Sequence, residues 1–246
     1  TNLFQHRTAV LKPFADRPIA FNESLRFQLA LPQGVRVMNP FLENPNALEA
    51  SAAFYKKFYD DQRDRVLILG INPGRFGAGL TGVPFTDPKR LRDECGITCY
   101  DGPPAHEPSS VFIYSMIEKF GGVHAFYSNF YINSICPLGF VSINAKGREV
   151  NYNYYDSKAL TTAAYGFILQ TLEQQLSFGI RRDVCFCLGT GKNADFIRKL
   201  NQEQGFFQEV IPLEHPRYII QYKSKSMPDY IDKFLAGFAA VSPDVG

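Results

Sequence analysis

A short apolar run, residues 66–69, leads directly into a segment rich in glycine and proline. A run this short, with a charged residue before it and turn residues after it, is typical of a strand buried on both faces of a parallel sheet. We therefore predict a strand from Val66 to Ile71, with Asn72 as the first residue after it. Open α/β sheets bind their ligands at the carboxyl ends of such strands, so this arrangement predicts a polar amide at the mouth of a binding crevice.

Strands and helices are expected to alternate along the rest of the chain. Apolar segments at residues 130–136, 184–188 and 210–213 predict three more strands. The helices expected around them run from Pro88, from Ser109 or Ser110 to Gly121, from Asp156 to Gly179, up to about Gln204, and from Pro228 to about Val241. Such alternation implies parallel strands joined by right-handed crossovers. The predicted fold class is α/β, a three-layer α/β/α arrangement with a small, mainly parallel central sheet.

The chain is long enough for one domain with a sizeable core. Its 246 residues are 45% hydrophobic, and no repeat, charge block or low-complexity tract indicates a second domain. We therefore expect a single domain over residues 1–246, with residues 1–60 as a helical region packed on it. The two helices of that region are expected from Asn22 to about Leu31 and from Asn44-Pro45 to about Asp60.

The charge balance by itself does not identify a partner. A formal net charge of +2 is small for a protein that binds nucleic acid tightly. Basic residues do cluster near residues 89–92 and 217–225, although solvated surface side chains are the more common explanation for either group alone. No apolar run approaches the length of a membrane span and no signal-peptide pattern is visible, so we expect no membrane partner and a cytoplasmic location.

The five cysteines do not predict a disulfide framework, because their number is odd and the chain is not small. Cys185 and Cys187 lie on one face of a predicted strand, which is typical of reduced core thiols.

The segment Gly189-Thr190-Gly191-Lys192 lacks the spacing of a phosphate-binding loop and is interpreted as a strand-to-helix turn. We expect no metal site.

Three segments together resemble a known enzyme family. Residues 70–77 read Gly-Ile-Asn-Pro-Gly-Arg-Phe-Gly, and residues 81–85 read Thr-Gly-Val-Pro-Phe. Residues 130–138 carry an asparagine before Cys-Pro-Leu, and residues 213–216 read Leu-Glu-His-Pro. This set resembles the uracil-DNA glycosylase superfamily, and most closely its single-strand-selective monofunctional branch. The resemblance covers roughly residues 60–235.

The resemblance implies two catalytic residues. Asn72 would position the water that attacks C1′ of the deoxyribose, which requires little deprotonation because the glycosidic bond breaks through an oxocarbenium-like state. His215 would donate a hydrogen bond to O2 of uracil, where negative charge accumulates as the base leaves. Taken alone, Asn72 is more typical of a turn residue and His215 of a structural histidine.

The resemblance also implies how the base is held. Asn133 would read the base edge, because its carbonyl accepts N3–H and its amino group donates to O4, an order that cytosine reverses. Phe85 would stack on the flipped pyrimidine. Gly74 and Ala78 would contact the base through their backbone or hold a water near C5. The structural alternatives are a cross-brace for Asn133 and a core position for Phe85.

The chain departs from the family at two places that bear on DNA binding. Arg75 stands where the family usually has proline, and it adds a positive charge at the rim of the pocket. After His-Pro, the chain continues directly into Arg217 and Tyr218, with Lys223 beyond them, instead of the family's wedge segment. We expect these four residues to contact DNA, with Arg217 or Tyr218 as candidates for filling the gap that a flipped base leaves.

The predicted protein is therefore a monofunctional glycosylase that hydrolyses the N-glycosidic bond of uracil in DNA and so initiates base excision repair. Oxidised uracils or deaminated purines are the alternative base range, and a non-catalytic DNA- or nucleobase-binding module is the alternative class. We expect a monomer that acts on single-stranded DNA, with double-stranded DNA left open.

No lysine stands in these motifs where a Schiff-base nucleophile is needed, so we expect no strand-cleaving lyase step. Some relatives hold an iron–sulfur cluster, but Cys95 and Cys99 have no partner pair with ligand spacing, so we expect no cofactor.

Overall fold

The structure, a computed structural model, describes residues 11–242. Its centre is a parallel sheet of four strands in the order β3-β2-β6-β7. The strands are β3 (Phe130–Ser134), β2 (Arg65–Gly70), β6 (Ile180–Leu188) and β7 (Glu209–Leu213). All six residues of β2 are buried, as the apolar run predicted. The fold class is confirmed as α/β with a mainly parallel central sheet between helices.

The register of this sheet aligns the ends of its strands. Gly70 pairs with Ser134 across β2 and β3, and Leu188 pairs with Leu213 across β6 and β7. The first polar residues beyond the strands therefore emerge along one edge of the sheet. The predicted turn at residues 189–191 also joins β6 to α9 (Lys192–Gln204).

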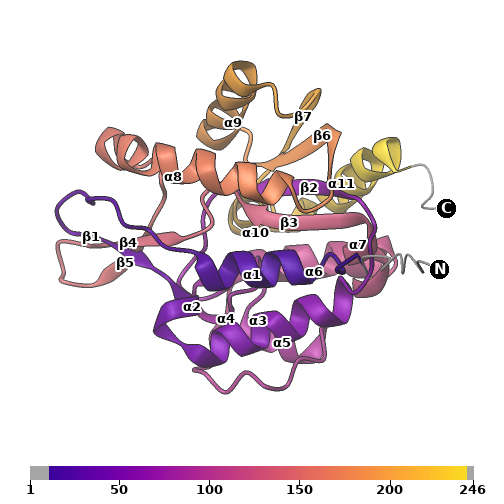
Figure 1. The fold of residues 1–246 in the computed structure, drawn as a ribbon, viewed down its shortest axis with the longest axis horizontal. Coiled ribbons are helices and arrows are strands. Elements are labelled where there is room, and N and C mark those ends of the chain that lie inside the picture. Colours follow the sequence, from indigo (N-terminus) through magenta and orange to yellow (C-terminus); the bar gives the residue numbers. More distant parts are fainter. Residues whose placement is uncertain (1–10, 243–246) are drawn as a thin grey trace, which may run out of the picture.

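Helices cover both faces of the sheet. On one face lie α8 (Lys158–Leu176), α1 (Asp16–Ser24) and α3 (Pro45–Phe58); in the view of Figure 1, α8 is drawn above β3 and α1 below it. On the other face, Phe238 of α11 (Met227–Val241) packs on Phe130 and Phe186, with ring centroids 4.6 and 5.0 Å apart. The remaining helices are α2 (Pro40–Glu43), α4 (Ala78–Thr81), α5 (Pro88–Asp93), α6 (Pro108–Phe120), α7 (Val123–Asn129), α10 (Pro216–Tyr222) and a 3₁₀ turn (Ser224–Ser226).

A second sheet, which the sequence did not predict, forms an arm on the left of Figure 1. It contains β1 (Val35–Met38), β4 (Gly139–Ile143) and β5 (Glu149–Tyr152), all antiparallel, in the order β1-β4-β5. A side chain at Gly139 would overlap the carbonyl oxygen of Pro73, so β4 packs tightly on the loop that follows β2. The arm therefore lies against the segment that contains Asn72.

The N-terminal helix differs from the prediction. The expected helix from Asn22 to Leu31 is wrong, because α1 ends at Ser24 and Leu25 adopts an extended conformation. Phe27 then packs edge-on against Phe140 and Phe167, with ring centroids 5.6 and 5.0 Å apart. These contacts with β4 and α8 partly bury the Phe27 ring, and such tertiary packing can override a local helical preference. The second predicted helix is present as α3, and Asn44 caps it by accepting the N–H of Asn46.

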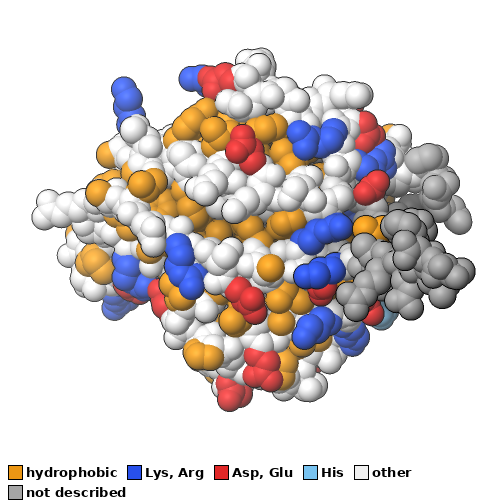
Figure 2. All heavy atoms as spheres, in the orientation of Figure 1, with side chains coloured by type: hydrophobic (Ala, Val, Ile, Leu, Met, Phe, Trp, Pro, Cys, Tyr) orange, Lys and Arg blue, Asp and Glu red, His pale blue; other side chains and the backbone are white. Residues whose placement is uncertain are grey.

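The surface carries charges of both signs. On the face shown in Figure 2, Lys and Arg side chains are interspersed with Asp and Glu side chains. Within residues 11–242, no helix is both long and apolar enough to cross a membrane.

Candidate active site

A cleft of about 290 Å³ opens at the carboxyl edge of the parallel sheet. It lies between the loop after β2, the start of α6, the end of β5 and helix α10. Its volume is at the lower limit for small-molecule sites, which suits a ligand of the size of a nucleobase. The side chains and backbone that line it come from Ile71, Asn72, Pro73, Gly74, Phe76, Phe85, Glu107, Pro108, Ser109, Asn151, Asn153, Tyr155, His215, Arg217, Tyr218, Gln221 and Tyr222.

The amide of Asn72 is held in a fixed orientation by the arm. Its Oδ1 accepts the backbone N–H of Tyr154 at 2.9 Å, and its Nδ2 donates to the carbonyl oxygen of Tyr152 at 3.3 Å. The neighbouring Asn151 accepts the backbone N–H of Arg75 at 3.0 Å. These bonds leave one Nδ2 hydrogen and one Oδ1 lone pair on Asn72 for a small polar molecule in the cleft.

Phe85 adopts an unusual backbone conformation, with φ of 54°, the only positive φ of a non-glycine residue in the described part of the chain. Such a conformation is strained and persists only when its surroundings enforce it. Thr81 helps to hold the chain in this conformation on both sides of Phe85. Its Oγ1 accepts the N–H of Val83 at 3.1 Å and donates to the carbonyl oxygen of Thr86 at 2.7 Å. This backbone conformation places the Phe85 ring against the end of β2, where Gly70 leaves room for it because it has no side chain.

His215 presents one defined donor to the cleft. Its Nδ1 accepts the backbone N–H of Arg217 at 3.1 Å, so His215 caps α10 and its ring proton must lie on Nε2. Burial, together with the charge of Arg217, lowers the pKa of His215 to about 4, so the ring is neutral near pH 7. The ring lies beside Phe85, with 5.8 Å between centroids.

Glu107 is a cleft residue that the sequence did not single out. Its Oε2 accepts the hydroxyl of Ser110 at 2.9 Å, while Oε1 makes no hydrogen bond to residues 11–242. A side chain at Gly77 would overlap its carboxyl group, and a Cβ at Gly74 would lie 3.5 Å from Oε1. Burial raises the pKa of Glu107 to about 7; the nearby Asp87 adds to the increase, and Ser110 and Arg217 reduce it. No motif surrounds this glutamate, so nothing in the sequence identified it.

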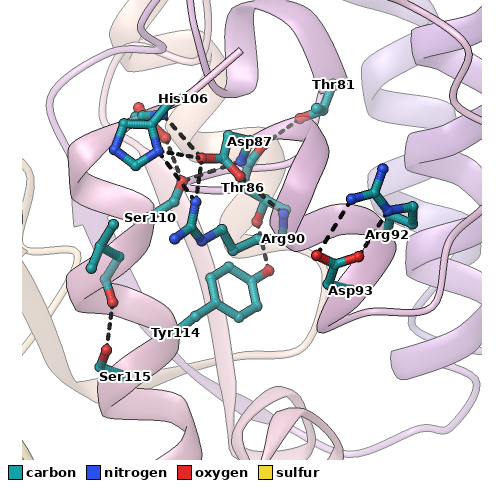
Figure 3. Close-up of polar contacts among 12 residues, drawn as sticks. Thr81, Thr86, Asp87, Arg90, Arg92, Asp93, His106, Ser110, Tyr114 and Ser115 are labelled. Atoms are coloured by element: carbon teal, nitrogen blue, oxygen red, sulfur yellow. Dashed lines mark hydrogen bonds and ion pairs between the residues drawn. The ribbon is translucent and has the colours of Figure 1, made fainter. Parts of the chain in front are cut away.

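The buried Asp87 supports Glu107. Asp87 caps α5 by accepting the N–H of Arg90 at 2.9 Å, and its other oxygen accepts the guanidinium of Arg90 and the backbone N–H of Glu107, each at 3.0 Å. Figure 3 shows Arg90, His106 and Ser110 gathered around Asp87. These bonds fix the segment before α6 and therefore the position of Glu107.

The structure brings most of the predicted site residues together, but not all of them. Asn72, Gly74, Phe85, His215, Arg217 and Tyr218 all line the cleft. Arg75 stands at its edge, with its guanidinium 4.3 Å from the centroid of the Phe76 ring. Lys223 is exposed just beyond α10, and Ala78 is buried beneath the loop, beside Pro73.

Asn133 does not line the cleft. Its Nδ2 donates to Oε1 of Gln175 at 2.6 Å and to the hydroxyl of Tyr131 at 3.2 Å, and its Oδ1 accepts the backbone N–H of Ser134 at 2.8 Å. Gln175 belongs to α8, so the Asn133 amide faces the helix layer and is satisfied there. This is the cross-brace that the sequence left open as an alternative.

The rim of the cleft exposes three aromatic rings. Phe76 is 42% exposed, and Tyr218 and Tyr222 of α10 are 43% and 66% exposed. The two tyrosine rings are neighbours, with 5.6 Å between centroids. Exposed rings beside a polar cleft form surfaces on which unpaired bases can stack.

The cysteines take no part in the cleft. Cys185 and Cys187 are buried in β6, and Cys95 contacts the Tyr114 hydroxyl at 3.2 Å. Within residues 11–242, no group of three or more His, Cys, Asp or Glu side chains is arranged to hold a metal ion.

Comparison with known proteins identifies the family of the chain. The family model described as the uracil DNA glycosylase superfamily matches residues 56–239, which include every residue that lines the cleft. The chain belongs to the uracil-DNA glycosylase superfamily. The solved structure of wild-type SMUG2 from Pedobacter heparinus is 55% identical, with a TM-score of 0.92, and the match covers 95% of this chain and 100% of that one.

Membership of the uracil-DNA glycosylase superfamily confirms the predicted family and enzyme class. The protein is a monofunctional uracil-DNA glycosylase, a hydrolase of N-glycosyl bonds with DNA as its substrate, and the non-catalytic alternative is not favoured. The strongest sequence signal, the segment from Gly70 to Phe85, also supplies the floor and one wall of the cleft.

Proposed function

We propose that Asn72, His215 and Phe85 release uracil from DNA by water-assisted hydrolysis in this cleft. The observation that carries the proposal is the single available proton of His215. Because Nδ1 is occupied by the N–H of Arg217, the neutral ring offers Nε2–H as its only donor, beside the Phe85 ring. A base stacked on Phe85 would therefore meet a neutral donor at its edge.

The chemistry follows from where charge develops. As the glycosidic bond breaks, negative charge accumulates on the carbonyl oxygens of the departing uracil, and a donor fixed near O2 stabilises that charge more than it stabilises the bound substrate. Neutrality of His215 is an advantage, because no proton has to be lost before the hydrogen bond is made. The pKa near 4 keeps this state over the physiological range.

Asn72 supplies the second requirement, a positioned water. Two bonds to the backbone of the arm orient its amide, and its remaining lone pair can accept a water hydrogen. A weak base suffices, because the sugar already carries positive charge when the water attacks. Placement, more than deprotonation, is therefore the contribution of Asn72.

The rim supports single-stranded DNA as the substrate form. The rings of Phe76, Tyr218 and Tyr222 can stack on bases that flank the uracil. The positive charges of Arg75, Arg217 and Lys223 can bind phosphates.

We further propose that the enzyme acts as a monomer. A cytoplasmic location stays a prediction from the sequence, and oxidised uracils or deaminated purines stay an open extension of the base range.

The test is release of uracil from an end-labelled oligonucleotide that carries one uracil. After incubation, alkali cleaves the strand wherever the base has been lost, and a parallel sample without alkali tests for strand cleavage by the enzyme. Cleavage only after alkali is expected, faster for the single strand than for the matched duplex, and strongly reduced with Asn72→Ala. An oligonucleotide with hypoxanthine at the same position measures the base range. No cleavage of the uracil strand after alkali would refute the proposed function.

A further inference from the structure

Asn133 and Ser134 are neighbours on β3, and their side chains point to opposite faces of the sheet. Asn133 faces α8, where Gln175, Tyr131 and the N–H of Ser134 use both ends of its amide. An amide committed to three protein partners on that face cannot read a base in the cleft without breaking them. The base edge must therefore meet a different group.

Ser134 lies on the face that carries Phe85. In the sheet register, Ser134 is paired with Gly70. A Cβ at Gly70 would lie 2.7 Å from Cζ of Phe85 and 3.7 Å from Oγ of Ser134, so ring and hydroxyl border the same small volume at the end of β2. This volume adjoins the Phe85 ring, which lines the cleft, whereas Ser134 itself lies behind the residues that line it.

The hydroxyl of Ser134 is not engaged by any of the residues that the structure describes. The residue is only 5% exposed, yet Oγ makes no hydrogen bond to any of the residues 11–242. The unpaired side-chain atoms that are fully buried in the described part of the chain are the Tyr100 hydroxyl and Glu214 Oε2, so the Ser134 oxygen still has access to the adjoining space and is free to donate to a ligand there. A ligand with a carbonyl oxygen at this place would supply the missing partner.

We propose that Ser134, rather than Asn133, is the side chain that contacts the base, with its hydroxyl donating to the exocyclic oxygen of the flipped base. This inference rests on the proposed function, since it concerns the same cleft. A hydroxyl both donates and accepts, whereas an oriented amide presents a fixed order of donor and acceptor. The site therefore recognises an exocyclic carbonyl at this edge, O4 of uracil or O6 of a deaminated purine, without a bidentate amide.

The experiment measures single-turnover base release from single-stranded oligonucleotides that contain uracil or 4-thiouracil, by wild type, Ser134→Ala and Asn133→Ala. Sulfur is a weak acceptor, so the hydroxyl contributes less for the thio base. Ser134→Ala is expected to slow release of uracil by about 10-fold, the effect of one lost hydrogen bond with its partner left unsatisfied. The rate of 4-thiouracil release by Ser134→Ala should be reduced clearly less, relative to wild type on the same base. Comparing each variant with wild type on the same base cancels the different leaving-group acidity of the two bases.

Asn133→Ala is the matched control, one residue away on the other face. It should lower the melting temperature, because Gln175 and Tyr131 lose their partner, and its rate deficit should be equal on the two bases. A Ser134→Ala enzyme within 2-fold of wild type on uracil would overturn the inference, as would a base-dependent deficit in Asn133→Ala alone. An inactive wild type would refute the proposed function itself, and this inference with it.

Discussion

The ring of Phe85 occupies the space that a side chain at Gly70 would take: a Cβ there would lie 2.7 Å from Cζ of Phe85. The ring cannot simply move aside, because Phe85 is already held in a left-handed backbone conformation by the bonds of Thr81. Gly70 is therefore needed less for the strand than for the position of the Phe85 ring, on which we propose that the base stacks.

Gly70→Ala should disturb this surface and slow uracil release by roughly 10- to 100-fold, because a displacement of about 1 Å at a reacting site has effects of that size. The measurement is the single-turnover rate together with the melting temperature. Gly166→Ala is the matched control, since Gly166 is exposed on α8 with no atom within 4 Å of the added Cβ. If Gly70→Ala kept the full rate, Phe85 would not be the stacking residue.

Asn72→Ala should lose most activity while it still binds uracil-containing DNA. The substitution removes the group that positions the water, and it leaves Phe85 and His215 in place. We expect a rate reduced roughly 100-fold or more, with DNA affinity changed only a few-fold. Activity within a factor of three of wild type would show that another group places the water.

His215→Ala should slow the chemical step by roughly 100-fold, corresponding to one fixed donor of about 3 kcal/mol. The deficit should shrink for 5-fluorouracil, whose anion needs less stabilisation by a hydrogen bond. Equal deficits on both bases would instead indicate a packing role for His215.

The pH dependence gives an independent test of His215. Its pKa is lowered to about 4, so the neutral donor persists from pH 8 down to pH 5. His215 should therefore introduce no loss of single-turnover rate in that interval, and any loss due to it should appear only near pH 4. A step near pH 6.5 that disappears in His215→Gln would contradict the neutral-donor assignment.

Glu107 should make stability fall as pH rises. Its pKa is raised to about 7 in the folded protein, above the ordinary value of 4.5, so the folded state holds a proton that the unfolded state has released between these values. Folding stability therefore decreases from about pH 4.5 to pH 7. Glu107→Gln should raise the melting temperature relative to wild type more at pH 8 than at pH 5. Glu209→Gln, at an exposed position, controls for the loss of one negative charge.

Tyr222→Ala should weaken binding of single-stranded DNA by about 1–3 kcal/mol if a flanking base stacks on this ring. Tyr222 is 66% exposed and lies next to Tyr218 at the rim. Binding is measured with a uracil-free single strand, so that chemistry does not interfere. Ile143→Ala, an exposed apolar position on β4, is the control and should leave affinity unchanged. Equal affinities for Tyr222→Ala and wild type would exclude this ring as a stacking platform.

The sequence by itself determined the strands of the central sheet and several residues of the cleft, among them Asn72, Phe85 and His215. The run at residues 66–69, with its flanking turn residues, is typical of a buried strand. Because ligands bind at the carboxyl ends of such strands, the sequence predicted that Asn72 and His215 lie close together. The contiguous segment from Gly70 to Phe85 was sufficient to indicate the enzyme family. These features could be predicted because each one either is a local sequence motif or follows from the topology rules of parallel sheets.

Tertiary structure alone decided the rest, because it depends on contacts between distant residues. The arm joins β1 to β4 across about one hundred residues, and only its folding places Tyr152 and Tyr154 on the amide of Asn72. Glu107 became part of the cleft through the bonds of Asp87 and the lack of a side chain at Gly77. The face that each residue of β3 presents was fixed by register: a shift of one residue exchanges Asn133 for Ser134, and no local signal in the sequence records that choice.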